Sequence, residues 1–255
     1  MKVDDKNQNS AAAGRRVFSG QTTKYIEDFY DRRAFFVKEY HTDSIKKILG
    51  LVRGMDAESV LDIGCGGGEI TKIIADAVGA KTVVGVDISR KQLARASKKG
   101  IKTFRVDLNR EKIPVNEKFD LIICSEVLEH IIDPDHVLAE IYRLSKPKAK
   151  QIFSTPNLAA WYNRISLLLG WQPFHLDTSF RFKGANPLFR HKEPYGHMRI
   201  FTKNSMIELL ARHGLNVIAF ETAVLGHDSA LRTAIERTLP LKGLKSIMIF
   251  LTERN

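Results

Sequence analysis

The chain has 255 residues and a mass of 28.8 kDa, and 44% of its residues are hydrophobic. This composition excludes a disordered protein and allows one large domain with a complete hydrophobic core. Only two cysteines are present, Cys65 and Cys124, and no apolar run is long enough to cross a bilayer. We therefore expect no disulfide framework, no integral membrane segment and a cytoplasmic location.

The net charge of +11 is unevenly distributed along the chain. From Ser145 onward there are 16 Lys and Arg against 7 Asp and Glu, whereas the earlier part is nearly balanced. A basic surface of this kind suits phosphate, anionic lipid or an acidic substrate, although the simpler interpretation is a solvated face that aids solubility.

The first part of the chain precedes the regular pattern of the domain. Residues 1–20 are polar and small, which predicts a mobile tail. Residues 22–53 have the spacing of helices, which Gly54 ends. Short, largely β-branched runs then predict buried strands. They lie at residues 59–63, 82–86, 101–106, 119–124 and 151–154.

Helical patterns alternate with these strands. Residues 69–78 place apolar side chains on one helical face, and Asp133 with Pro134 opens a second helix that continues to Leu144. This βαβ series predicts an α/β fold with a parallel sheet and helices on both faces. Further elements follow the last of these strands: helices at 202–212 and 228–238, and strands at 216–221 and 246–252. We expect one domain over residues 21–255, with an insertion at about 156–201.

The loop VLDIGCGGGEIT, residues 60–71, is a candidate ligand site. A glycine-rich turn after the first strand of such a sheet lets backbone approach a ligand closely. A phosphate-binding P-loop requires Gly-Lys-Ser/Thr at its end, which is missing here. A dinucleotide site requires Gly or Ala at the sixth position counted from Gly64, where Glu69 stands instead and disfavours an anionic ligand.

Three acidic residues follow the predicted strands and agree with a ligand that is not anionic. Asp62 precedes the glycines, Asp87 ends the second strand, and Asp107 follows the third. With these motifs the sequence resembles the class I S-adenosylmethionine-dependent methyltransferases. Their acidic-x-Gly-x-Gly-x-Gly motif is matched by Asp62 with Gly64, Gly66 and Gly68. The resemblance implies that Asp87 binds the ribose and that Asp107, with Leu108, contacts the adenine.

The resemblance also implies a Rossmann-like sheet of seven strands in which the last strand is antiparallel and lies between the fifth and sixth. S-adenosylmethionine is then the expected cofactor. The residues expected to bind it are Asp62, Gly64, Cys65, Gly66, Gly68, Asp87, Ile88, Asp107, Leu108 and Ser125.

Candidate catalytic residues follow the fourth strand in SEVLEHIIDP. Glu126, Glu129 and His130 are spaced i, i+3, i+4, so a helical turn presents them on one side. The segment is similar to the Glu-x-x-Glu-His of ubiquinone-biosynthesis O-methyltransferases, with their type 11 methyltransferase domains, and of enzymes that methylate the 2′-hydroxyl of small RNAs. The latter use a later histidine, for which His197 is the candidate. The resemblance therefore implies either a divalent metal such as Mg²⁺ on these four residues, or a metal-free pocket in which His130 and Glu126 act near the nucleophile.

The insertion is apolar first and basic afterwards. Its apolar helical face, Leu158, Trp161, Tyr162, Ile165, Leu168 and Leu169, predicts a helix that packs on the sheet and covers an apolar substrate, with contact to a membrane surface as the alternative. Basic residues interleaved with aromatics follow at 181–199 and suit a phosphorylated or carboxylated small molecule, or a single-stranded nucleic acid.

Three functions follow from these observations. The leading hypothesis is methyl transfer to oxygen of a small-molecule or lipid-like acceptor. RNA 2′-O-methylation and a non-catalytic, cofactor-binding role are the alternatives. The sequence identifies no oligomeric interface.

Overall fold

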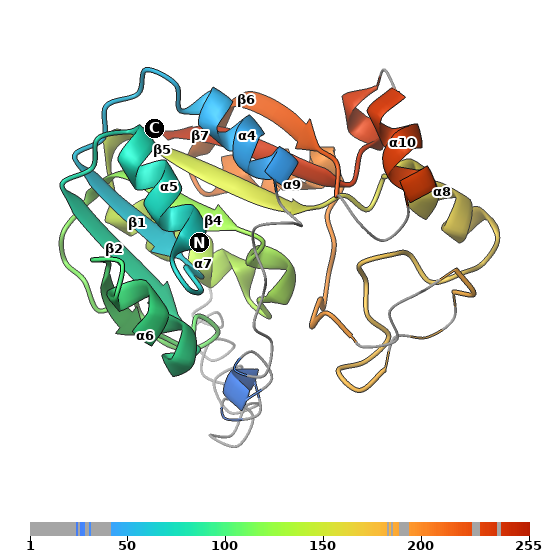
Figure 1. Ribbon diagram of the computed structural model, residues 1–255, viewed down its shortest axis with the longest axis horizontal. Helices are drawn as coiled ribbons and strands as arrows, with labels where there is room; N and C mark the ends of the chain where they lie inside the picture. The colour runs from blue at the N-terminus through green and yellow to red at the C-terminus, as the bar shows by residue number, and fades with distance from the viewer. Residues whose placement is uncertain are drawn as a thin grey trace, which may run out of the picture.

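The computed structural model describes residues 24, 26–28, 31, 42–182, 184, 186–188, 194–225, 230–238 and 241–255. Its centre is a seven-stranded sheet with the order β3-β2-β1-β4-β5-β7-β6 (Figure 1). The strands are β1 (Ser59–Ile63), β2 (Thr82–Asp87), β3 (Lys102–Arg105), β4 (Phe119–Ser125), β5 (Ser145–Pro156), β6 (Leu215–Ala223) and β7 (Ile247–Arg254).

The sheet is parallel on one side and antiparallel on the other. β1 pairs in parallel with β2 and β4, and β4 pairs in parallel with β5. β7 lies antiparallel between β5 and β6. The expected α/β fold and the inserted antiparallel strand are therefore confirmed. Because β1, β2 and β4 run in the same direction, their carboxyl ends meet at one edge of the sheet.

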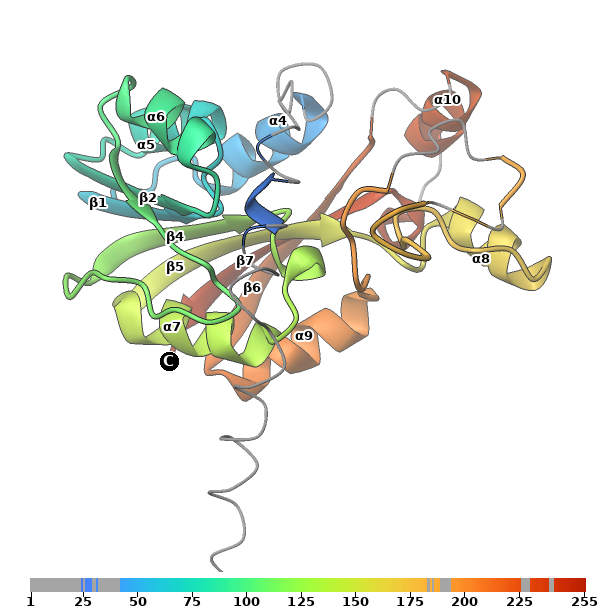
Figure 2. The same ribbon diagram turned by 90° about the horizontal axis from the view of Figure 1, so that it is seen from below.

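Helices cover both faces of the sheet, as Figure 2 shows. On one face lie α4 (Thr42–Leu51), α5 (Glu69–Ala77) and α6 (Arg90–Ser97), and on the other lie α7 (Pro134–Leu144) and α9 (Lys203–Arg212). Each layer has its own hydrophobic core. Ile48 and Ile74 pack in the first, and Val137 and Leu210 pack in the second. The inner strands β1, β4 and β7 are largely buried on both faces, which explains their mainly apolar sequences.

Several element boundaries differ from the predictions. Helix α6 was not predicted because only Leu93 and Ala96 of its residues are apolar and buried, although Ser89 caps it by accepting from the Gln92 N–H. Strand β5 begins at Ser145, six residues before the predicted start, because its first half is polar and lies towards the end of the sheet. Of the predicted 22–53 helices, α4 is described, and the predicted tail at 1–20 lies outside the described residues.

The insertion leaves the sheet at the end of β5. It contains α8 (Trp161–Leu168), and α10 (Ala230–Thr238) lies at the same end of the molecule (Figures 1 and 2). The short 3₁₀ turn η2 (Lys242–Leu244) precedes β7. The buried Asn157 fixes the start of the insertion by donating to the carbonyl oxygens of Gly243 and Lys245, both at 2.9 Å.

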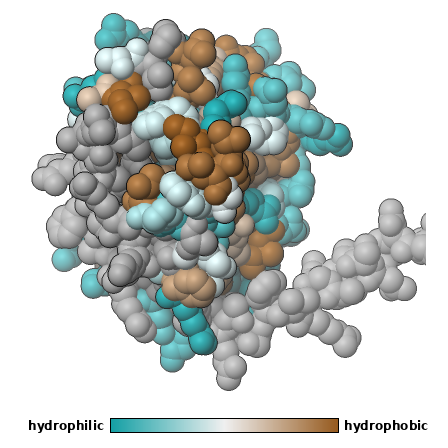
Figure 3. Space-filling model, turned by 90° about the vertical axis from the view of Figure 1, so that its right-hand side faces the viewer, coloured by the Kyte–Doolittle hydropathy of each residue, from teal (hydrophilic) through white to brown (hydrophobic). Residues whose placement is uncertain are grey.

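The predicted apolar face of this helix is buried only in part, and its buried part packs within the insertion. Tyr162 is buried and packs edge-to-face on Phe174, whereas Ile165 and Leu168 are exposed and the polar Asn163 and Ser166 are buried. Apolar side chains gather at the surface of this end of the molecule (Figure 3). The polar side chains of α8 face inward because the rest of the insertion, rather than the sheet, supplies its packing partners.

Candidate functional site

The glycine loop after β1 is folded by left-handed residues. Gly64, Gly66 and Gly68 have φ of 75°, 51° and 77°, which side chains rarely tolerate. A Cβ at Gly64 would come within 2.4 Å of the Val127 side chain, whereas a Cβ at Gly66 would meet no heavy atom within 4 Å among the described residues. The loop therefore packs closely on the β4 side and leaves its centre open at Gly66, where a ligand can approach the backbone.

Two of the predicted acidic residues hold this loop in place. Asp62 is buried and accepts a hydrogen bond from Thr71 Oγ1, and burial raises its pKa to about 7. Asp87 accepts from the backbone N–H of Gly66 at 2.9 Å and of Ser89 at 2.8 Å. Burial also raises the pKa of Asp87. A positive charge would stabilise either buried carboxylate and a negative charge would destabilise it, so this edge favours a cationic ligand over an anionic one.

The remaining predicted cofactor residues lie at or near the same edge. Ile88 follows β2, and Cys65 is a buried free thiol inside the loop. The buried Asp107 follows β3 and accepts from the Asn109 N–H, and Leu108 is buried beside it. Ser125 ends β4, with its hydroxyl 2.7 Å from that of Ser154. The structure thus brings the residues from separate motifs to one edge.

The negative charge of Glu69 is compensated by two neighbouring cations. Its carboxylate lies 2.9 Å from Arg95 and 3.1 Å from Lys99, both of which neutralise it. The electrostatic argument against an anionic ligand therefore rests on Asp62 and Asp87 rather than on Glu69.

Sequence reasoning missed two acidic residues near this edge. Asp31 accepts from Ser89 Oγ, and Glu27 pairs with Arg105 at 3.2 Å and with Arg90 at 3.5 Å. They come from the predicted helical region before the first strand. Their helical pattern gave no sign that they would reach β2 and β3.

The turn after β4 differs from the expected regular helix. Glu126 has a left-handed φ of 56°, and the short 3₁₀ helix η1 (Leu128–His130) follows it. The three candidate residues therefore do not share one helical face. Glu126 accepts from Ser154 Oγ at 2.7 Å, and Glu129 accepts from Thr155 Oγ1 at 3.2 Å. The strained backbone at Glu126 is what directs its side chain towards β5.

Both glutamates are held in a low-dielectric environment. Burial raises the pKa of Glu126 to about 7, and burial together with the charge of Glu126 raises the pKa of Glu129 well above its ordinary value. Glu129 is fully buried, and its Oε1 atom has no hydrogen-bond partner within the described part of the chain. Such a pair is stabilised by protons or by a cation.

His197 reaches this turn from the insertion. Its segment is bound to η1 because the Met198 N–H donates to the Glu129 carbonyl at 2.9 Å. The rings of His130 and His197 lie 4.5 Å apart in an edge-to-face arrangement. One carboxylate oxygen of Glu129, one ring nitrogen of His130 and one ring nitrogen of His197 lie within 4.8 Å of one another. Glu126 is outside this group.

The hydrogen bonds of the two histidines fix their tautomers. His130 Nδ1 donates to the Gly196 carbonyl at 3.1 Å, and His197 Nδ1 donates to the His175 carbonyl at 2.7 Å. A carbonyl oxygen only accepts, so each neutral ring carries its proton on Nδ1 and its lone pair on Nε2. The two rings are therefore prepared either to accept a proton or to bind a metal ion.

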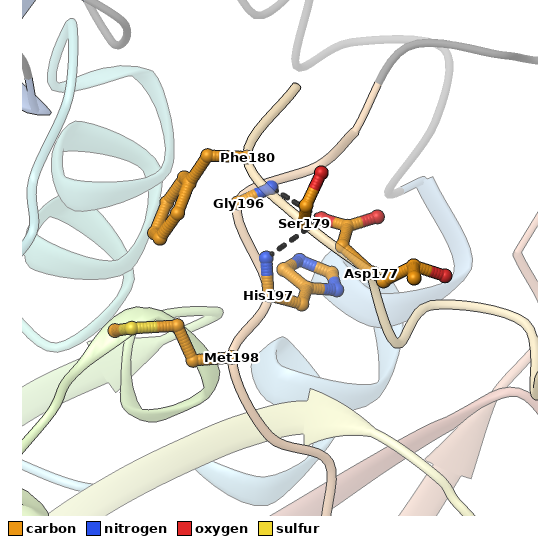
Figure 4. A pocket seen from close by; sticks show the side chains of 7 residues that line it. Asp177, Ser179, Phe180, Gly196, His197 and Met198 are labelled. Carbon is orange, nitrogen blue, oxygen red and sulfur yellow. Dashed lines mark hydrogen bonds between the residues drawn. The ribbon is translucent and has the colours of Figure 1, made fainter. Parts of the chain in front are cut away.

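A cavity of about 250 Å³ adjoins His197 (Figure 4). It is lined by Asp177, Thr178, Ser179, Phe180, Gly196, His197 and Met198. The Asp177 carboxylate accepts from the backbone N–H of Gly196 at 2.6 Å and of His197 at 3.0 Å, which joins the two segments that form the walls. Sequence analysis named only His197 of this set, because the others carry no motif and meet only in the folded insertion.

Comparison with known proteins identifies the family. The sequence model described as a methyltransferase domain matches residues 29–219. The chain belongs to the class I S-adenosylmethionine-dependent methyltransferases. The matched region contains the glycine loop, the turn after β4 and the whole insertion.

Curated relatives match part of this methyltransferase. It is 37% identical over 106 residues to a ubiquinone biosynthesis O-methyltransferase of Pseudomonas putida (strain W619), a match that covers 39% of this chain and 45% of the relative. A protein of the same description from Pseudomonas entomophila (strain L48) is 37% identical over 107 residues, with coverage of 39% and 45%. The match thus spans about half the length of these relatives.

Solved methyltransferase structures share the fold. The N-methyltransferase NodS of Bradyrhizobium japonicum WM9, in complex with S-adenosyl-L-homocysteine, has a TM-score of 0.59 at 14% identity, with 92% of this chain and 97% of that chain covered. Magnesium protoporphyrin IX methyltransferase from Synechocystis PCC 6803 has a TM-score of 0.55 at 17% identity, with 96% and 100% covered. In the described part of this methyltransferase, no helix is long and apolar enough to span a membrane.

Proposed function

We propose that this methyltransferase transfers a methyl group from S-adenosylmethionine to an oxygen atom of a small-molecule or lipid-like acceptor. The observation that carries the proposal is the arrangement at the carboxyl edge of the sheet. There the open glycine loop after β1 and the Glu129–His130–His197 cluster follow adjacent strands, and a cavity adjoins the cluster. The partial similarity to ubiquinone O-methyltransferases also supports oxygen as the acceptor atom.

The residues of the cofactor side supply binding and alignment. Asp87 would accept hydrogen bonds from the ribose hydroxyls, and Gly66 would lie against the cofactor without a side chain between them. When bound, the cofactor would supply a methyl group on a sulfonium, whose methyl carbon an oxygen nucleophile attacks in line while the thioether, S-adenosylhomocysteine, leaves. Proximity and alignment therefore account for much of the rate enhancement that the protein provides.

His130 is the residue best prepared to act as the base. Its Nε2 lone pair would take the proton of the acceptor hydroxyl while the new O–C bond forms and the C–S bond breaks. The Gly196 carbonyl holds the ring in this tautomer and favours the imidazolium that results. His130 is a catalytic residue in this proposal, whereas Glu126 and Ser154 act as positioning residues for the turn.

The cavity favours a compact acceptor over a nucleic-acid strand. Phe180 and Met198 give it apolar surface, and Asp177 and Ser179 give it polar groups. A volume of about 250 Å³ lies just below the range of about 300–1,000 Å³ for small-molecule sites, which suits a compact acceptor. RNA 2′-O-methylation and a non-catalytic role remain outcomes of the test.

A divalent ion fits the cluster chemically. Glu129, His130 and His197 would hold it, and the buried Glu129 Oε1 that lacks a partner among the described residues is a ready ligand. Two imidazole nitrogens and one carboxylate favour a borderline ion such as Zn²⁺, Mn²⁺ or Fe²⁺ over the Mg²⁺ expected at first. Such an ion would lower the pKa of an acceptor hydroxyl near it.

The test is transfer of labelled methyl from S-adenosylmethionine into a host extract, separated into organic, small aqueous, RNA and protein fractions. We expect label in the organic or small aqueous fraction, and loss of transfer in His130→Ala with cofactor binding retained. His136→Ala is the matched control, because the described side-chain contact of the half-buried His136 is with the Glu111 carbonyl, and its backbone N–H still bonds to Asp133 in the variant.

Three results would contradict the proposal. Label in RNA would assign a nucleic-acid acceptor, and full activity of His130→Ala would remove it as the base. Cofactor binding without label in any fraction would favour the non-catalytic role. The metal is tested separately by titrating Mn²⁺ or Zn²⁺ into the chelated protein by calorimetry, with Glu129→Gln expected to abolish stoichiometric binding.

A further inference from the structure

Helix α8 buries polar side chains beside Tyr162 and turns the apolar side chains of its second half to the surface. The side chains of Asn163 and Ser166 point inward and are 0% and 1% exposed. Four apolar residues point outward instead. They are Ile165 at 45%, Leu167 at 52%, Leu168 at 85% and Leu169 at 52% exposure. Single exposed apolar residues are common on proteins, but four within five positions form a patch that requires an explanation.

Buried hydrogen bonds fix this orientation. Asn163 donates to the Asn157 carbonyl at 3.0 Å and accepts from the Phe174 N–H at 2.7 Å. Ser166 Oγ accepts from Asn186 Nδ2 at 3.1 Å. Rotating the helix to bury its leucines would break these bonds and leave buried amide groups unpaired. The hydrogen bonds of Asn163 and Ser166 therefore keep the leucines of α8 at the surface.

The insertion presents further apolar surface near this helix. Leu188 is exposed, and its backbone N–H donates to Asn186 Oδ1, while Asn186 also bonds to the Gln172 carbonyl and to Ser166. Leu188 is thus tied to the same segment as α8. We call the exposed side chains of residues 165, 167–169 and 188 the leucine face; Figure 3 views this end of the molecule, where apolar side chains gather.

The insertion is basic in sequence, and exposed arginines lie in its described part. Residues 157–200 contain six Lys and Arg against two Asp and Glu in the sequence. Arg164 and Arg181 are exposed. The Asp177 carboxylate accepts two backbone N–H groups, which reduces its effect at the surface. Exposed leucines on the same helix as the exposed Arg164 match an anionic bilayer, whose headgroups attract the arginine while its acyl region receives the leucines.

We propose that the leucine face docks this methyltransferase on an anionic membrane surface. α8 then lies in the interface plane and does not cross the bilayer, in keeping with its eight residues. A second copy is a poorer occupant, because a symmetric contact through α8 would bring the Arg164 side chains of the two copies towards each other. The docking is independent of the proposed methyl transfer, although it would bring the acceptor cavity close to lipid-like acceptors.

Co-sedimentation of the full chain with vesicles tests the proposal without any methyl transfer. We expect binding to phosphatidylglycerol-containing vesicles and weak binding to phosphatidylcholine alone. The variant Leu167→Ser/Leu168→Ser/Leu169→Ser should lose about tenfold or more in partition coefficient, since three side chains lose their insertion. Ile218→Ser is the matched control, because Ile218 is 51% exposed on β6, away from the insertion. Circular dichroism and cofactor binding check that each variant is folded.

The charge contribution is measured with Arg164→Glu, which should weaken binding to the anionic vesicles and leave binding to neutral vesicles unchanged. Failure of the wild-type protein to bind anionic vesicles would overturn the proposal, as would undiminished binding by the triple variant. A dimer that the triple variant dissociates, detected by analytical ultracentrifugation, would assign the face to a second copy instead.

Discussion

Alanine substitutions at three glycines with left-handed backbone test separately how a new Cβ affects stability and ligand binding. Gly79, Gly66 and Gly64 have φ of 70°, 51° and 75°. A Cβ meets no described heavy atom within 4 Å at Gly79 or Gly66, but it comes within 2.4 Å of Val127 Cγ2 at Gly64. Gly79 follows α5 at the other end of the sheet, whereas Gly66 lies at the proposed cofactor site.

The expected magnitudes follow from these differences. Alanine in a left-handed conformation costs about 1–2 kcal/mol in the free energy of unfolding, which is the whole expected effect for Gly79→Ala. Gly66→Ala should cost the same stability but weaken cofactor binding by about tenfold or more, because its methyl group enters the open face of the loop. Gly64→Ala adds overpacking of about 1–3 kcal/mol and should be the least stable.

Urea unfolding monitored by circular dichroism gives the stabilities, and calorimetry with S-adenosylhomocysteine gives the affinities. Gly64→Ala combined with Val127→Ala should recover part of the overpacking cost, because Val127 Cγ2 is removed. Equal stability losses at Gly64 and Gly79 would refute the packing argument. An unchanged dissociation constant for Gly66→Ala would refute the assignment of this loop to the cofactor.

Further predictions concern three acidic residues and Asn157, which lies at the start of the insertion. Asp87→Ala should weaken S-adenosylhomocysteine binding by about tenfold to a hundredfold in calorimetry, because the acceptor for the ribose hydroxyls is lost; unchanged affinity would place the ribose elsewhere. Burial raises the pKa of Asp62 and Glu126 to about 7, so the folded apo protein holds protons that the unfolded chain releases from about pH 4 upward. Its stability should therefore fall as the pH rises to about 7 and then level off, and Glu126→Gln should flatten this slope in thermal melts; a stability that rises over this window would contradict the burial of both groups. Asn157→Ala should cost about 2–4 kcal/mol in urea unfolding, since the two part-buried carbonyl oxygens of Gly243 and Lys245 lose their donor, and a cost below 1 kcal/mol would show that water replaces it.

Much of the fold was predictable because its signals are local. The strands at 59–63 and 82–86 are continuous apolar runs bounded by turn residues, and the structure places β1 and β2 there. Helix α6 was missed for the opposite reason. Its sequence, Arg90–Ser97, has only two apolar residues facing the core, so hydrophobic periodicity gives almost no signal and the cap at Ser89 is the main sign.

The candidate site was predictable only in part. Glu126, Glu129 and His130 were found because they are near in sequence, but their shared helical face was wrong because Glu126 adopts a left-handed conformation that i, i+3, i+4 spacing does not reveal. His197 was named through a resemblance, and the structure brings it next to His130. Asp177 and Phe180 were missed because no spacing rule connects a loop residue to a cavity wall.

The sequence by itself determined the α/β class, the glycine loop and the acidic residues that follow the strands, because backbone torsions, apolar periodicity and strand ends are properties of short segments. Only the tertiary structure decided which side of α8 is buried. Its apolar stripe predicts burial of the leucines, yet the hydrogen bonds of Asn163 and Ser166 with distant residues turn that stripe to solvent. Long-range polar contacts of this kind are invisible to the local pattern, since their partners are distant in sequence and each buried polar group that they satisfy would be costly to leave unpaired.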